Sequence, residues 1–297
     1  MNKLQILLIL TVSMFFAMTV SAQKTAPKKA VFAALDDGKV LEPIAFIEGG
    51  KLKSLGEEAS GENLAEFVKK YLKPNAKYNL IFGGSNAGTA TVVKNFADSE
   101  CAANQAEISV VSKTVKLKGF LMALATDAVP KKNAKLVRKM PTAAERKSIN
   151  ELVVAEMKAK RVPIKNTGEL RYHNLTKLDV DGDGIAEFVG TYWYNTGVKK
   201  RSLLFFIAES DANGVISIPF TKFQDLDEES VMSGDVKDLD NGIYHELLID
   251  MLDFDSDGQS EIFTMSQGFE GSNFNAYKRV DGKWTQILET SNYHCGY

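Results

Sequence analysis

The sequence predicts a mainly β fold with a few helices, in which an α+β N-terminal half precedes a C-terminal half of antiparallel, blade-like sheets. Short runs of β-branched and aromatic residues, bounded by glycine- or aspartate-containing turns, recur along most of the chain. Helical periodicity is clear in only two segments, both within residues 60–160. After residue 168, a unit of one acidic loop and three strands occurs twice.

The first 22 residues have the pattern of a secretory signal peptide. Lys3 supplies the positive charge, residues 4–20 are nearly all apolar, and Val20 and Ala22 place small residues before a cleavage point. An uncleaved membrane anchor is the alternative interpretation. No later apolar run is long enough to span a bilayer. We therefore expect a secreted or periplasmic protein with no membrane span after signal cleavage.

The rest of the chain is expected to form two domains, an α+β domain over residues 30–162 and a β domain over residues 168–297. Charge changes between them: residues 130–161 contain ten Lys/Arg and three Asp/Glu, whereas residues 179–261 contain five Lys/Arg and nineteen Asp/Glu. The acidic segment repels nucleic acid and attracts cations, so no nucleic-acid partner is expected. We interpret the basic segment as the solvated face of a helix rather than as a nucleic-acid site.

In the N-terminal half, strands broken by glycine turns are expected over residues 31–55, and further strands over 78–82, 89–96, 107–115 and 119–125. A short helix is expected over residues 60–72, because apolar side chains recur there at helical spacing. The clearest helix covers residues 142–160, where Thr142 and Glu145 form a capping box and Pro163 ends the helix. Its predicted buried face consists of Ile149, Leu152, Val153 and Met157.

In the C-terminal half, strands over residues 188–194, 202–210 and 215–223 follow the first acidic loop. Strands over 262–269, 274–280 and 284–290 follow the second, with tight turns between them. The two loops are offset by 74 residues, and this order is that of a small antiparallel sheet used as a repeating unit.

The two acidic loops, LDVDGDGIAEFVG and LDFDSDGQSEIFT, have acidic residues at relative positions 1, 3, 5 and 9 and glycine at position 6. Alternate aspartates in a tight turn can converge on one point, and the residue at position 7 can add a backbone carbonyl. Clustered hard oxygens, several of them charged, suit calcium. The predicted ligands are Asp179, Asp181, Asp183, Ile185 and Glu187 in the first loop, and Asp253, Asp255, Asp257, Gln259 and Glu261 in the second.

An EF-hand is the competing interpretation of these loops. It requires a bidentate glutamate at position 12, where this chain has Gly190 and Thr264. It also leads into a helix, whereas both loops here lead into aromatic, β-branched segments. A metal-free acidic turn stays open as the other alternative.

The loops DVDGDGIAE and DFDSDGQSE resemble the calcium loops of FG-GAP and VCBS-type repeats, which also form blades of integrin alpha-chain propellers. The resemblance covers residues 170–284 and implies calcium-holding loops that join strands. The chain has two copies, too few for a closed propeller, and it lacks the Phe-Gly and Gly-Ala-Pro signatures.

Two cysteines, Cys101 and Cys295, are the only ones in the chain. An even number in an exported protein favours a disulfide between them, with two free buried thiols as the alternative.

No catalytic motif is recognisable. The three histidines lack the spacing of a zinc site, and GGSNAG around Ser85 has Ala87 where a nucleophile elbow needs glycine. The sequence therefore favours an exported calcium-binding β protein with a structural or binding role, whose partner is an unidentified protein or glycan. A secreted or periplasmic hydrolase with an unrecognised active site is the alternative, and a pocket with convergent histidine and carboxylate groups would favour it.

Overall fold

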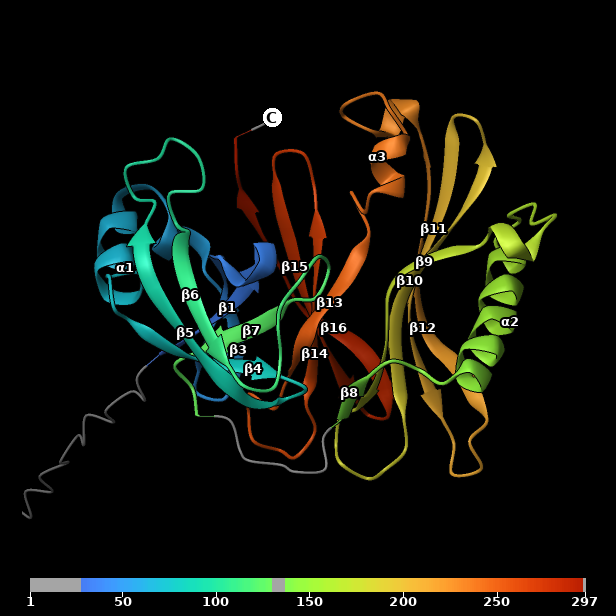
Figure 1. Ribbon diagram of the computed structural model, residues 1–297, viewed down its shortest axis with the longest axis horizontal. Coiled ribbons are helices and arrows are strands. Elements are labelled where there is room, and N and C mark those ends of the chain that lie inside the picture. Colours follow the sequence, from blue (N-terminus) through green and yellow to red (C-terminus); the bar gives the residue numbers. More distant parts are fainter. Residues whose placement is uncertain (1–27, 130–136, 296–297) are drawn as a thin grey trace, which may run out of the picture.

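The structure is a computed structural model that describes residues 28–129 and 137–295 (Figure 1). The expected signal peptide, residues 1–22, lies outside the described residues. Within the described ranges, no helix combines the length and the apolar character needed to cross a membrane. The mainly β class predicted from the sequence is confirmed, with antiparallel sheets throughout.

The N-terminal half forms a closed barrel. Its strands are β1 (Lys29–Leu35), β2 (Val40–Glu48), β3 (Lys51–Ser54), β4 (Lys77–Phe82), β5 (Ser85–Asn95), β6 (Ala106–Ser112) and β7 (Ala123–Thr126). They pair in the order β1-β7-β4-β5-β6-β2-β3, and β1 also pairs with β2. That additional pairing closes six of the strands into a ring and leaves β3 at the edge.

Side chains alternate across the barrel wall because successive residues of a strand point to opposite faces. In β1, Phe32 and Ala34 belong to the interior cluster, whereas Val31 and Ala33 pack outside against the C-terminal half. Helix α1 (Leu64–Tyr71) packs Phe67 against the interior cluster. This helix is shorter than predicted, because residues 61–63 form a 3-10 turn that begins at a glycine in the left-handed region (φ +52°).

The C-terminal half contains two antiparallel meanders of four strands. The first meander consists of β9 (Arg171–Asp179), β10 (Glu187–Gly197), β11 (Lys200–Ser210) and β12 (Ile216–Asp227). The second meander consists of β13 (Glu246–Leu252), β14 (Glu261–Gln267), β15 (Gly271–Val280) and β16 (Lys283–Tyr293). Each acidic loop connects the first two strands of its meander, so the predicted repeating unit is present twice.

These elements stack in layers: barrel, second meander, first meander and helix α2 (Ala143–Ala159) (Figure 1). One apolar cluster joins the barrel wall to the second meander, and another joins the two meanders. The second meander is therefore covered on both faces, which explains why every residue of β13 is buried. Helix α2 has the predicted capping box, and it packs Ile149, Val153 and Met157 on the outer face of the first meander.

Strand β8 (Val137–Lys139) pairs with β9 and extends the first meander to five strands. Both β8 and α2 precede Pro163, yet both pack on the first meander. The last strand of the barrel, β7, ends at Thr126, and the first strand of the next sheet, β8, begins at Val137. The expected domain division at residues 162–168 stays a prediction.

Cys101 and Cys295 lie at disulfide distance, as predicted, with alpha carbons 5.1 Å apart. Their contact joins the loop between β5 and β6 of the barrel to the segment that follows β16.

Candidate metal centres

The two acidic loops lie side by side at one end of the molecule, opposite the short helix α3 (Lys237–Asp240) (Figure 1). Ser260 of the second loop donates its backbone N–H to the carbonyl of Val180 in the first, at 2.8 Å. The backbone of one loop therefore supports the other, although the two loops are offset by 74 residues in the sequence.

The two loops share four internal hydrogen bonds. Backbone N–H groups at positions 2, 5, 6 and 7 donate to the carboxylates at positions 9, 3, 1 and 5. In the first loop the donor–acceptor pairs are Val180–Glu187 (3.1 Å), Asp183–Asp181 (3.2 Å), Gly184–Asp179 (3.1 Å) and Ile185–Asp183 (2.6 Å). In the second they are Phe254–Glu261 (3.3 Å), Asp257–Asp255 (3.3 Å), Gly258–Asp253 (3.1 Å) and Gln259–Asp257 (2.8 Å).

Glycine at position 6 is required by this turn. Gly184 and Gly258 have φ values of +88° and +97°, a region that side chains with a Cβ rarely adopt. The backbone can then turn its N–H groups toward the carboxylates. The acidic residues therefore occur at the positions where this turn directs its N–H groups toward their carboxylates.

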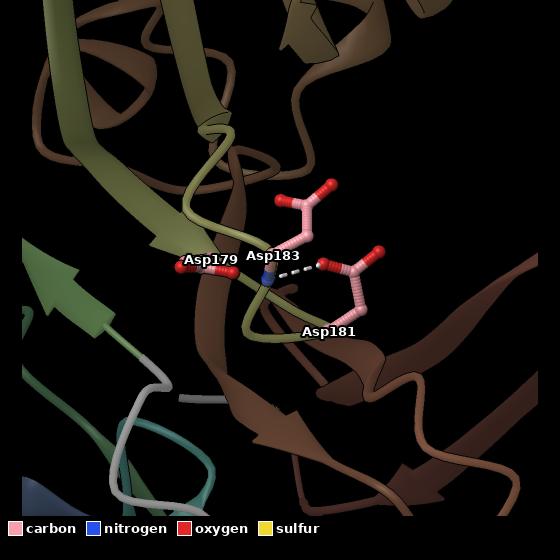
Figure 2. Close-up of side chains that lie close together, drawn as sticks. All are labelled: Asp179, Asp181 and Asp183. Carbon is pink, nitrogen blue, oxygen red and sulfur yellow. Dashed lines mark hydrogen bonds between the residues drawn. The ribbon is translucent and has the colours of Figure 1, made fainter. Parts of the chain in front are cut away.

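Carboxylate oxygens converge in each loop. Ligand atoms of Asp179, Asp181 and Asp183 lie within 4.8 Å of one another, and these three side chains are drawn in Figure 2. In the second loop the corresponding set is Asp253, Asp255 and Glu261. Each cluster could hold a metal ion, and the geometry does not specify which metal.

The two clusters do not contain the same predicted positions. The first leaves out Glu187, which bonds to Arg279, and the second leaves out Asp257, whose carboxylate lies 2.7 Å from Lys278 Nζ. Ile185 and Gln259, predicted to offer carbonyl oxygens, donate their N–H groups to the aspartates at position 5.

Two adjacent basic residues of β15, Lys278 and Arg279, form ion pairs with the two acidic loops. Lys278 contacts the second loop, with its Nζ against Asp255, Asp257 and Glu261. Arg279 contacts the first loop at Glu187 (3.0 Å) and Asp181 (3.6 Å), and it also bonds to Glu209 of β11 at 2.6 Å. Neighbouring residues of a strand point to opposite faces, which allows a single Lys-Arg pair to reach both sites.

Sequence reasoning missed this pair. The only signal was two consecutive cations within a predicted strand of an otherwise acidic half of the chain.

The glutamates at position 9 are buried, with exposed fractions of 3% for Glu187 and 0% for Glu261. Burial raises the pKa of each carboxyl to about 7, although Arg279 and Lys278 oppose the shift. Burial also raises the pKa of Asp181. A cation bound beside either glutamate carboxyl would favour its ionised form and oppose this rise in pKa.

Asp253 supplies an observation that favours a ligand in the second loop. Its Oδ1 atom is buried and accepts no hydrogen bond from the described part of the chain. Buried carboxylate oxygens are costly when they are unpaired, because they lose their hydration without compensation. A cation in the cluster would supply the missing partner, so the donor set fits a hard metal ion.

The other candidate residues lie away from these loops. Ser85 begins β5 directly after the turn from β4, which confirms the hairpin interpretation of GGSNAG. His173 stacks on Trp193, and the buried His245 lies edge-on to both rings. Burial lowers the pKa of His245 to about 3 and keeps it neutral. His294 lies 2.8 Å from Glu42 of β2, a contact that no local pattern predicts across 252 residues.

No family model, no curated protein and no solved structure matches this chain.

Proposed function

We propose that this protein is an exported calcium-binding β protein with a structural or binding role, and that each acidic loop holds one calcium ion. The observation that supports this most is the repetition of the same four backbone-to-carboxylate bonds in two loops of the same spacing. The resemblance of the loops to FG-GAP and VCBS-type calcium loops agrees with the proposal. The partner is proposed to be a protein or a glycan outside the chain.

Calcium is preferred over magnesium on chemical grounds. Calcium accepts six to eight oxygen ligands in flexible arrangements, whereas magnesium holds its waters tightly and demands a near-ideal octahedron. A turn that offers several carboxylates and backbone carbonyls suits the first ion better.

An ion in either loop would also stabilise the fold. The loops connect the two meanders through the bond between Ser260 and Val180, and a metal would neutralise the repulsion among the carboxylates. We therefore assign the ions a structural role at the junction of the two sheets.

Calcium is expected to raise the melting temperature of the protein. At about 1 mM free calcium, a site with a dissociation constant of ~0.1 mM adds roughly 1.4 kcal/mol, and two sites add about twice that. Thermal unfolding in calcium, magnesium and chelator measures the effect. Asp181→Asn and Asp255→Asn should each remove about half of the calcium-dependent shift, while the exposed Asp235→Asn serves as a charge-matched control.

A melting temperature that is the same in calcium, magnesium and chelator would contradict this proposal. The loops would then be acidic turns neutralised by Lys278 and Arg279 alone.

The first loop is expected to bind calcium more tightly than the second, because Lys278 contacts two members of the second cluster, Asp255 and Glu261. Arg279 reaches only Asp181 of the first cluster, at 3.6 Å. Burial lowers the pKa of Lys278, but the surrounding carboxylates raise it by more. The net pKa is therefore raised, and the ammonium stays charged. Calcium must therefore displace a bound cation there. In an Asp181→Asn background, Lys278→Met should tighten the second site roughly tenfold by calorimetric titration.

The matched control for this prediction is Lys283→Met, which removes an exposed lysine at the start of β16 and should leave the affinity unchanged. An unchanged or weaker affinity in the Lys278→Met variant would show that the ammonium does not compete with the ion.

The alternative proposal, a secreted or periplasmic hydrolase, is favoured by one observation: His294 and Glu42 line a cavity far from the acidic loops. Of the described residues around this cavity, none is Ser, Thr or Tyr, and both cysteines are paired with each other. A hydroxyl or thiol nucleophile is therefore missing from this set. The arrangement of His294 and Glu42 therefore supports ligand binding better than nucleophilic catalysis.

A further inference from the structure

A cavity of about 790 Å³ lies between the barrel, the second meander and the segment that follows α3. Helix α3, which contributes Asp238 to its lining, is at the end of the molecule opposite the acidic loops (Figure 1). The size of the cavity falls within the range of small-molecule sites. The barrel contributes Val40 and Met122 to its walls, and the second meander contributes Leu247, Met265 and Phe269.

The buried polar groups of this cavity are held by hydrogen bonds. Glu42 is 1% exposed, and its Oε1 lies 2.8 Å from His294 Nε2 and 3.0 Å from Asn292 Nδ2. The side-chain amide of Gln105 lies 2.7 Å from the same histidine nitrogen. The hydrogen bond to Glu42 raises the pKa of His294, so the two form a pair whose charges offset each other when the histidine is protonated.

Two further carboxylates, Asp36 and Asp238, line the cavity, and no described lining residue is Lys or Arg. Asp36 forms an ion pair with Lys39 at 3.9 Å. Both side chains are 66% exposed, so solvent screens the attraction between them. Asp238 accepts a hydrogen bond from the neutral hydroxyl of Ser233. The cavity therefore has an excess of negative charge beside apolar walls.

We propose that this cavity binds a small organic amine, a ligand with an aromatic or apolar body and one protonated amino group. Met122, Met265 and Phe269 receive the body, because thioethers and aromatic rings pack well against a flat apolar group. The half-buried Asp238 attracts the ammonium group, the exposed Asp36 adds a weaker, solvent-screened attraction, and the excess of negative charge disfavours carboxylate ligands. This inference is independent of calcium, since the acidic loops lie at the opposite end.

The test compares three compounds that share an indole body: tryptamine, tryptophol and indole-3-acetate. Calorimetric titration of the full chain should give the tightest binding for tryptamine, roughly tenfold weaker binding for tryptophol, and the weakest for indole-3-acetate. Asp36→Asn/Asp238→Asn should reduce the preference for the amine over the alcohol to about twofold or less while tryptophol binding is kept. Glu66→Gln, an exposed neutralisation on α1 outside the cavity, should keep the full preference.

Melting curves establish that the variants are folded before titration. The proposal is overturned if tryptamine does not bind at about 1 mM. It is equally overturned if indole-3-acetate binds as tightly as tryptamine, or if the double variant keeps the preference for the amine.

Discussion

Replacing Arg138 by methionine is expected to destabilise the fold by about 3–5 kcal/mol. The Arg138 side chain is 3% exposed and lies 2.8 Å from Asp250, which is fully buried. The same guanidinium nitrogen donates to the carbonyls of Met122 (3.1 Å) and Ile249 (2.6 Å). Methionine would preserve much of the volume but leave the buried carboxylate without its counter-charge and two carbonyls without this donor.

Asp250 also joins three parts of the chain. Its carboxylate accepts the backbone N–H groups of Gly83 (3.0 Å) and Gly84 (3.3 Å) in the barrel, while Arg138 comes from β8 and Asp250 itself from β13. Because these elements meet only in the folded protein, losing the donor weakens the contact between the barrel and both meanders.

The pH dependence of this variant has a definite sign. Burial raises the pKa of Asp250, and the Arg138 guanidinium opposes that shift. Without the guanidinium the pKa rises further above its unfolded value. A group with a raised folded pKa stabilises the fold at low pH and loses that contribution as pH rises through the folded pKa. The destabilisation by Arg138→Met should therefore be larger at pH 8 than at pH 5.

Urea denaturation of the parent and of Arg138→Met measures the difference in free energy of unfolding. Lys69→Met is the control, because Lys69 and Glu66 form an exposed pair on α1 at 3.6 Å and should contribute little. A loss below about 1 kcal/mol in Arg138→Met would mean that Asp250 relaxes or takes up a proton at small cost.

Local patterns predicted the elements that depend on local chemistry. The capping box of Thr142 and Glu145 places the start of α2, and the acidic spacing predicts the conformation of both loops. The three strands after each acidic loop also agree with the sequence prediction, because each pairs with a neighbour across a short turn. Strands β9 and β13 precede the loops and lie outside the predicted strand ranges.

No local sequence pattern predicted how distant strands and side chains pair in the fold. Strand β7 pairs with β1 and β4, so the barrel closes through contacts between residues up to 95 positions apart, such as Val31 and Thr126. Strand β13 reads as an apolar run in which Glu246 and Asp250 are exceptions, and nothing nearby identifies the partners of those carboxylates. In the structure the partners of Glu246 include Lys222, Tyr277 and Thr264. Those of Asp250 include Arg138 and the backbone of Gly83.

The candidate metal centres illustrate the same limit. Sequence spacing predicted the acidic loops, because each loop is a local structure, but it could not identify Lys278 and Arg279 as the counter-ions of their carboxylates. That contact depends on where β15 passes, and therefore on the register of the whole second meander.

Removing the disulfide between Cys101 and Cys295 is expected to cost about 2–5 kcal/mol. The two cysteines are 194 positions apart, so the cross-link greatly restricts the unfolded chain. In the chain-entropy description the stabilisation grows with the logarithm of the closed loop and approaches about 5 kcal/mol at this length. Cys101→Ser/Cys295→Ser removes the cross-link without leaving a free thiol.

Neighbouring contacts will retain the folded position of the C-terminal segment in that variant. Asn292 donates to Glu42 (3.0 Å) and to the carbonyl of Pro43 (2.7 Å), and His294 bonds to Glu42. The loss should therefore arise mainly in the unfolded state. Urea denaturation should show a lower midpoint together with a steeper dependence on urea, because a chain without the cross-link exposes more surface when it unfolds.

Reductant provides the matched control for the serine variant. It should shift the parent protein toward the behaviour of Cys101→Ser/Cys295→Ser and leave the variant itself unchanged. A parent that unfolds at the same urea concentration with and without reductant, once its thiols are shown to be free, would refute the stabilising role. If reductant shifts the parent as expected, the cross-link stabilises the fold by restricting the unfolded chain. Glu42 and its hydrogen bonds then position the C-terminal segment beside the proposed amine cavity.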